Sequence, residues 1–376
     1  MRTEVNTQQN FNSNILLVPD SLKHDAVWGS ELNLQTSLLI NKPNWMAKAS
    51  AVLDNWFYYP DSGLDMQNQY LDLQYAYLTE RSRWQINGGY INDAILSSKA
   101  NQIQGIVFGR VQRELFSIIP GWTYSVSEYT KVNLSYSYFN SKYPAILLSP
   151  ASTDATYPNS VSNTLSSSVN NLYSEYLSFN SLLSATAFDT QTRKIDYINL
   201  FIGLKYSPSF DSEIALSIGG QYSQSTYQFY SIGQSYSQRI DQFSPLFDVS
   251  LTKKFENSSI ILSYSQQSTP SINSNLFRSD LVSLSANHRL SNLFSTAFGF
   301  SYYQIETPKQ AGSSLSQKSY QLNSNLTYNY SEKSTISASY NFQARDIVAT
   351  TGVFSEPQYA HIISLSLRYN FDELQF

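Results

Sequence analysis

Few side chains of this sequence are suited to catalysis or metal binding. Cysteine is absent, which excludes thiol catalysis, thiolate metal sites and disulfides. The three histidines, His24, His288 and His361, do not stand in an HExxH or comparable metal-ligand spacing. His24 lies near Asp20 and Asp25 and is the one candidate for acid–base chemistry. We therefore predict no catalytic residue, no metal site and no enzymatic activity.

The sequence also lacks the patterns that bind phosphate groups or nucleic acid. The glycine pairs 88–89 and 219–220 lie inside segments with strand periodicity, where a bend or close inward packing explains them. The net charge is only −4, without a basic patch or an acidic block. We therefore expect no cofactor and no nucleic-acid partner.

The composition predicts a special environment for the chain. Charged residues make up 14% and aromatic residues 15%, whereas an average soluble domain has about 25% charged residues. No stretch approaches the roughly 18 consecutive apolar residues that a membrane-spanning helix requires. A closed barrel needs apolar residues only at alternate positions, because neighbouring strands pair all backbone groups. Any membrane crossing must therefore use strands.

Strict alternation of apolar and polar residues recurs along the chain. In the last such segment, 363–371, isoleucine, leucine and aromatic residues interleave with Ser364, Ser366, Arg368 and Asn370, which places apolar and polar rows on opposite faces. The other segments are 28–40, 132–138, 200–206, 214–222, 298–302, 320–330 and 336–342. One face is expected to meet lipid and the other water. In this register Leu326 and Leu365 face lipid, and Asn325 faces the interior.

Short polar turns alternate with longer links, as in barrels with short periplasmic turns and long external loops. The short turns are predicted near 42–44, 80–82, 127–129, 207–209, 254–257, 290–292 and 331–333. The fold class predicted is all-β, a transmembrane antiparallel up-and-down β-barrel of about 16 strands, with 14 to 18 possible. It occupies residues 1–376 as a single domain, with both termini on the periplasmic side.

One link, at about 143–192, is far longer than the others and carries many aromatic and leucine residues. Such a composition favours an ordered loop over a disordered one. The loop could fold inward as a constriction or gate, or extend two strands above the membrane. Tyr173, Tyr176 and Phe179 are its candidate constriction residues.

The candidate functional surface is the row of side chains that should face the barrel lumen. Its charged and aromatic members are Glu31, Lys48, Asp54, Tyr70, Asp72, Lys131, Asp248, Tyr303, Arg345 and Arg368. An ion-selective pore would show a sustained ring of one sign, whereas these charges have both signs among neutral hydrogen-bonding groups. The row suits water and hydroxyl-rich solutes. The rings of Tyr70 and Tyr303 could stack on sugar faces or merely fill the barrel.

Aromatic residues cluster close to the predicted turns, for example Trp45, Trp84, Trp122, Tyr330 and Phe371. Such rings prefer the headgroup zone of a membrane. Ordinary strand propensity, or the core of a soluble β-sandwich, is the alternative. A sandwich would not keep a polar interior row through so many strands, which favours a membrane girdle.

The alternating segment 363–371, the terminal Phe376 and the Tyr/Ser hairpin residues 134–138 make this chain resemble Gram-negative porin-like outer-membrane barrels. The layout is also similar to barrels encoded with exopolysaccharide secretion systems, including the exosortase-linked group. The resemblance implies a bacterial outer-membrane protein whose aromatic C-terminal residue the barrel-assembly machinery reads. The polar N-terminal residues lack the apolar core of a secretory signal, so we expect that a signal peptide has been removed.

These observations predict an outer-membrane pore for hydrophilic solutes, and polysaccharide export or translocation is the favoured role. Its expected partners are outer-membrane lipid, a hydrophilic solute or polysaccharide, and a periplasmic export partner. A general diffusion porin is the first alternative. A structural or adhesive surface barrel, occluded by its long loop, is the second.

Overall fold

The computed structural model describes residues 2–17, 26–96, 110–144, 146–148, 157–191, 193–231, 234–270, 276–306, 315–349 and 357–371. In these ranges no helix is long and apolar enough to span a membrane. The only helical segment described is a single 3-10 turn, Ser62–Leu64, which the Asp61 side chain caps by accepting a hydrogen bond from the Gly63 amide.

The described chain is almost entirely β-strand. The strands are β1 (Arg2–Asn12), β2 (Val27–Lys42), β3 (Trp45–Tyr59), β4 (Met66–Leu78), β5 (Ser82–Leu96), β6 (Arg110–Ser125), β7 (Thr130–Lys142), β8 (Ile146–Leu148), β9 (Ser160–Ser174), β10 (Leu177–Thr190), β11 (Arg193–Ser209), β12 (Ser212–Ser231), β13 (Gln234–Lys254), β14 (Ser258–Pro270), β15 (Leu276–Arg289), β16 (Phe294–Glu306), β17 (Leu315–Asn329), β18 (Ser334–Ala349) and β19 (Gln358–Asn370). Within the described residues, 18 strands form one closed antiparallel ring, and the short β8 pairs with β6 only.

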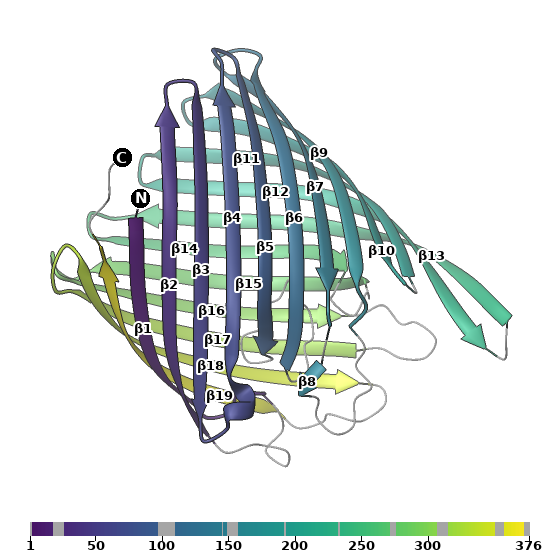
Figure 1. Ribbon diagram of the computed structural model, residues 1–376. Helices are drawn as coiled ribbons and strands as arrows, with labels where there is room; N and C mark the ends of the chain where they lie inside the picture. The colour runs from purple at the N-terminus through teal and green to yellow at the C-terminus, as the bar shows by residue number, and fades with distance from the viewer. Residues whose placement is uncertain are drawn as a thin grey trace.

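The ring closes between the first and last strands. Residues of β1 pair with β19 from Glu4–Asn370 to Asn12–Ile362, and the amide of Phe371 donates to the carbonyl of Thr3 at 3.0 Å. The strands are strongly tilted, so those of the front and rear walls cross in projection (Figure 1). The start of β1 and the end of β19 lie side by side at the rim that carries the short turns (Figure 1). We call this end of the barrel the turn rim and the opposite end the loop rim.

The outer wall is apolar through the middle of the barrel. Leu32, Leu34 and Leu38 are exposed on β2, and Leu326 and Leu365 are exposed on β17 and β19, as the alternation predicted. Aromatic rings pair on the outer wall near the turn rim, including Trp45 with Tyr75, Trp84 with Trp122, Phe294 with Tyr328, and Tyr369 with Phe371. Their placement matches the predicted girdle.

Charged pairs bound this apolar band on the side of the loop rim. Arg278 and Asp280 on β15 form an ion pair at 3.2 Å, and the hydroxyl of Tyr264 on β14 donates to the same aspartate at 2.9 Å. Arg239 and Asp241 on β13 form an equivalent pair at 3.2 Å. Because isolated charges are costly in hydrocarbon, these pairs mark where the apolar surface ends.

The predicted fold class is confirmed, and the ring of 18 strands lies at the upper end of the predicted range. The count differs because the link predicted at 143–192 contains β9 and β10, which pair along their length with each other and with β7 and β11. The outward row of β9 holds Leu165 and Val169 among serine and asparagine, so its apolar alternation is weak. Because of this weak alternation, the sequence predicted a loop where the structure has β9 and β10.

The predicted constriction residues therefore lie elsewhere. Tyr173 and Phe179 flank the short β9–β10 turn, with ring centroids 6.2 Å apart, and Tyr176 lies within that turn. The carbonyl of Tyr176 accepts from the amide of Ser207 at 2.7 Å, which anchors the turn beside β11. All three side chains are exposed at the turn rim. The prediction that they form a constriction loop is wrong, because the strands on either side of this turn, β9 and β10, are part of the barrel wall.

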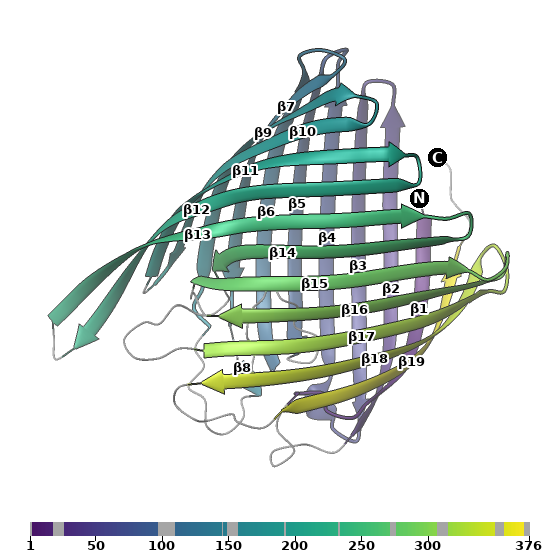
Figure 2. The ribbon, with the colours of Figure 1, turned by 180° about the vertical axis from the view of Figure 1, so that it is seen from behind.

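One hairpin extends past the rest of the wall. Strands β12 and β13 pair from Ser212–Lys253 to Ser231–Gln234, whereas β13 pairs with β14 only from Phe247 to Lys254. The end of this hairpin therefore projects from the loop rim, as Figures 1 and 2 show from opposite sides. The predicted link at 225–238 is largely strand for this reason.

The inner wall differs between its two ends. On β3 the inward Asp54, Trp56 and Tyr58 are buried toward the loop rim, whereas the inward Lys48 is exposed toward the turn rim. We call these two parts the loop half and the turn half of the lumen. Other buried inward residues of the loop half are Asn68, Ile95, Val111, Ile195, Ser225, Ile305, Gln317, Arg345 and Gln358, which come from strands around the whole ring.

Candidate functional site: a packed loop half and an open turn half

A network of hydrogen bonds holds the acidic side of the loop half. One carboxylate oxygen of Asp54, Oδ2, accepts from the indole Nε1 of Trp56 at 2.9 Å and from Nδ2 of Asn68 at 3.1 Å. The amide oxygen of Asn68 in turn accepts from the backbone of Ala94 at 3.0 Å. Because Asp54 and Asn68 face each other across β3 and β4, strand register alone brings them together. The predicted lumen residue Asp54 is thus a buried, partnered group.

A bidentate ion pair lies beside this network. Arg113 on β6 binds Asp93 on β5 with two hydrogen bonds, Nε to Oδ1 at 2.9 Å and the terminal nitrogen to Oδ2 at 2.7 Å. The side chains are 16% and 12% exposed, so water screens the pair only weakly. Tyr70 lies within electrostatic range of this pair and of Asp54 and Glu31. The loop half thus gathers Tyr70, Glu31 and Asp54 of the predicted set.

The chain after β1 turns into the lumen. Ile15 and Leu16 pack with Trp56, Tyr58 and Met66 in one buried apolar cluster. The segment is anchored to β19, because the amide of Ser13 donates to the carbonyl of His361 at 3.0 Å and the Ser13 hydroxyl accepts from the His361 amide at 2.9 Å. Residues 13–17 are therefore an inward segment that narrows the loop half.

Arg345 secures that inward segment from the far strands of the ring. Its terminal nitrogen donates to the carbonyl of Leu17 at 2.6 Å, and its Nε donates to Oε1 of Gln358 at 2.7 Å. Arg345 is only 5% exposed. Tyr303 lies within electrostatic range of Arg345 and accepts from Gln317 at 3.2 Å. The predicted lumen residues Arg345 and Tyr303 therefore belong to one packed group.

Two tyrosines complete the narrow part of the lumen. Tyr143 and Tyr157 lie with ring centroids 6.1 Å apart and pack on Ile95 and Val111. Burial raises the pKa of Tyr143 above its ordinary value, against the lowering effect of Arg113. The hydroxyl of Tyr157 is also within electrostatic range of Arg345, so this side chain reaches from β5 and β6 toward β18.

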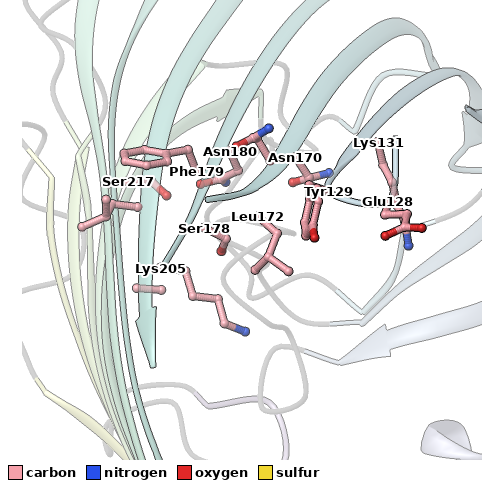
Figure 3. Close-up of a pocket in the computed structure, with 13 residues that line it drawn as sticks. Glu128, Tyr129, Lys131, Asn170, Leu172, Ser178, Phe179, Asn180, Lys205 and Ser217 are labelled. Atoms are coloured by element: carbon pink, nitrogen blue, oxygen red, sulfur yellow. The ribbon is translucent and has the colours of Figure 1, made fainter. Parts of the chain in front are cut away.

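In the turn half, the pairing register aligns a polar row across neighbouring strands. Lys131 pairs with Asn170, Asn170 with Asn180, Asn180 with Gly203, Gly203 with Ser217, and Ser217 with Asp248. We call these six residues the turn-half row. They line or adjoin a recess of about 380 Å³ that also includes Leu172, Ser178 and Lys205. Figure 3 shows Lys131, Asn170, Asn180 and Ser217 around this hollow.

The remaining predicted lumen residues do not join either group. Lys48 pairs with Gln74, and Asp72 pairs with Gly89, both on the inner wall of β3 to β5. Arg368 forms an ion pair with Glu4 at 3.0 Å across the seam where the ring closes. The predicted residues are thus divided between the packed loop half, the turn-half row, the inner wall of β3 to β5 and the seam where the ring closes.

Sequence reasoning missed Asp93, Arg113 and Tyr157. Asp93 alternates with the outward apolar residues of its strand, as the inward Gln85 and Asn87 do, so extending that alternation along β5 would have found it. Arg113 lay in a stretch whose alternation is poorly marked. Tyr157 lies outside the strands, and no local pattern indicates that it returns to the wall.

The histidines offer no catalytic arrangement in the described chain. Nδ1 of His288 lies 2.6 Å from the Ser258 hydroxyl near the turn rim, and Nδ1 of His361 lies 3.0 Å from the Tyr340 hydroxyl on the outer wall. His24 lies outside the described residues. No group of three or more possible metal ligands occurs in the described ranges. The described side chains of the lumen can form hydrogen bonds and carry charge, which are the properties that matter for contact with a solute.

Comparison by sequence finds no matching family model and no matching curated protein. Solved structures do match. OccAB3 of Acinetobacter baumannii superposes with a TM-score of 0.51 at 10% identity, covering 98% of this chain and 99% of that one. OccAB2 of the same organism gives 0.53 at 10% identity, with 99% and 98% covered. The outer membrane protein opdK of Pseudomonas aeruginosa gives 0.52 at 9% identity, with 98% and 99% covered.

At such low identity the likeness shows the fold, and it extends over nearly the whole of each chain. A closed ring of strands satisfies every backbone group in lipid, and the exposed apolar wall of this ring has the character that lipid requires. This chain is a bacterial outer-membrane β-barrel.

Proposed function

We propose that this barrel is a passive channel for small hydrophilic solutes, narrowed in its loop half and open in its turn half. The observation that carries the proposal is the difference in burial along the inner wall. Side chains such as Asp54, Asn68 and Arg345 are buried by their neighbours, whereas Lys48, Lys131 and Asn180 are exposed to the lumen. With short turns on the periplasmic side, the narrow part lies toward the cell exterior.

The chemistry of the narrow part favours uncharged or mixed-charge solutes. Its charges of both signs are largely partnered by protein groups, as in Arg113 with Asp93 and Arg345 with Gln358 and Leu17. Such a lining presents hydrogen-bonding edges without a sustained field of one sign. It therefore filters mainly by size.

Polysaccharide export is the weaker candidate. A polymer needs an uninterrupted wide path, and the inward segment 13–17 with Tyr143 and Tyr157 crowds the loop half. The resemblance to barrels of exopolysaccharide secretion systems rests on the sequence pattern, and an exporter would also need a periplasmic partner. A surface scaffold that conducts nothing is the remaining alternative, and conductance separates it from a channel.

The test is single-channel conductance in planar bilayers, together with liposome swelling in neutral sugars of increasing size. The wild-type barrel should conduct ions and admit only small sugars. Replacing both Tyr143 and Tyr157 by alanine should raise the conductance and the size limit, because their rings occupy the narrow part. Tyr222→Ala, which removes a ring from the outer wall, is the matched control and should change neither value.

A folded wild-type barrel that shows no conductance would overturn the proposal and favour the scaffold. Passage of long dextrans through the wild-type barrel would instead favour the polysaccharide conduit.

A further inference from the structure

We propose that the turn-half row is a weak binding site for a neutral sugar of one or two rings. The site consists of Asn170, Asn180, Ser217 and Lys131, with Leu172 beneath them, and it opens to the periplasmic side. Its physiological use rests on the proposed channel function, since a solute reaches this row after the narrow part. Its recess of about 380 Å³ lies at the lower end of the range for ligand pockets, roughly 300–1,000 Å³.

The spacing of the row suits a chain of hydroxyl groups. Neighbouring strands lie about 4.8 Å apart, so directly paired residues repeat at that distance around the wall. Lys131, Asn170 and Asn180 are successive members, and Ser217 follows beyond Gly203. Side chains of adjacent strands can therefore bind hydroxyls at both ends of one ring.

The polar groups of the row are free to bind a ligand. Within the described residues, the side chains of Asn170, Asn180 and Ser217 have no hydrogen bond to other protein groups. Two neighbouring asparagines contrast with them: Asn133 donates to Ser168 at 3.1 Å, and Asn171 donates to Thr130 at 2.7 Å. An amide that is exposed to the lumen and unpaired offers both a donor and an acceptor, as recognition of a hydroxyl requires.

Gly203 brings two of these groups together. A Cβ at this position would lie within 3 Å of both the Asn180 amide oxygen and the Ser217 hydroxyl. The two side chains therefore lean over the glycine from opposite sides. They converge on one point of the wall although a strand separates them, and any larger residue at position 203 would force them apart.

The charges around the recess favour a neutral ligand over an anion. Lys205 is neutralised by Glu213, with Nζ and Oε2 2.7 Å apart. Glu128 lines the same recess as Lys131, so their opposite charges oppose each other in attracting an ion. Leu172 supplies an apolar surface beside the asparagines, against which the C–H face of a sugar ring can pack.

The experiment measures equilibrium binding of radiolabelled maltose to the purified barrel in detergent, which requires no conductance. We expect weak, saturable binding that falls about tenfold in the Asn170→Ala/Asn180→Ala variant, because each lost hydrogen bond is worth a few-fold in affinity. Asn87→Ala removes an asparagine from the inner wall of β5 and is the matched control; it should bind maltose like the wild type.

Gly203→Leu gives a second, independent variant, which should also lose binding because it separates Asn180 from Ser217. Retained heat-modifiable migration on gels shows that each variant is folded. Unchanged maltose binding in these folded variants, or no binding in the wild type, would overturn the site while leaving channel function standing. Tighter binding of galacturonate than of maltose would also overturn it, since it would indicate an anion site centred on Lys131.

Discussion

The two halves of the lumen are built from the same strands, yet their polar side chains behave differently. In the loop half, Asp54 accepts two side-chain hydrogen bonds and Arg113 binds Asp93 through two more. In the turn half, Asn170 and Asn180 are exposed, and within the described chain they have no protein partner. The difference lies in what covers each wall, because segment 13–17 and Tyr157 return onto the loop half.

Polar side chains of the inner wall have different roles in the two halves because they differ in contact with water. A polar group removed from water must find a protein partner, so burial by inward segments requires the networks of the loop half. A polar group that stays in contact with water can keep its hydrogen-bonding capacity for a passing solute. The loop half is thus suited to selection by size, and the turn half to transient binding.

The largest expected difference concerns apolar packing. Trp56→Ala should destabilise the barrel by about 3–5 kcal/mol, because the ring is 6% exposed and packs with Ile15 and Leu16. Leu172→Ala in the turn half should cost less than about 1 kcal/mol, since Leu172 is 43% exposed. Urea unfolding from lipid vesicles measures both values. Equal losses would contradict the division into a packed and an open half.

The second prediction concerns the arginine that holds the inward segment. Arg345→Met should destabilise the barrel by about 2–3 kcal/mol, because the carbonyl of Leu17 and the Gln358 side chain lose a charged donor inside the protein. It should also raise single-channel conductance as segment 13–17 loosens. Lys131→Met is the control in the open half and should leave stability nearly unchanged. Normal conductance in the Arg345 variant would show that segment 13–17 is held by its apolar contacts alone.

The third prediction compares two ion pairs by double-mutant cycles. Alanine replacements of Asp93 and Arg113 should give a coupling energy of about 1.5–3 kcal/mol, because the pair is bidentate and screened little by water. The exposed pair of Lys205 and Glu213 should give about 0.2–1 kcal/mol. A larger coupling energy for Lys205 and Glu213 than for Asp93 and Arg113 would contradict the expected order of the two pairs.

The smallest effect is a pH dependence at the turn rim. The hydrogen bond from Lys253 holds the pKa of Asp211 well below its ordinary value of 3.8, and Ser209 adds to this effect. A carboxylate with a lowered pKa stabilises the folded state above the unfolded pKa, and this contribution is lost as the pH falls through the folded pKa. The wild-type barrel should therefore lose stability relative to Asp211→Asn as the pH falls below about 4.

Unfolding curves of the two proteins between pH 6 and pH 2 measure that difference. Because the Asp211 side chain is about half exposed to solvent, salt should weaken the effect. Parallel pH profiles would show that the ion pair with Lys253 does not contribute in solution.

Much of the wall could be predicted from the sequence because local periodicity defines it. Alternation assigned Leu326 and Leu365 to the outer face, and both are exposed on the outer wall of the barrel. Where the outward row contains serine and asparagine, as in β9, the same rule fails. Strand pairing then depends on neighbours that a local pattern does not reveal.

The sequence by itself determined a polar and an apolar face for most strands, the short turns and the closed all-β barrel, because each depends on residues close together in the chain. Only the tertiary structure decided which lumen residues meet. Arg345 binds the carbonyl of Leu17, which is 328 positions away, and Lys131 and Asp248 lie at opposite ends of one row. Closure of the ring and the inward return of segment 13–17 create these contacts, and neither leaves a periodic signal in the residues it joins.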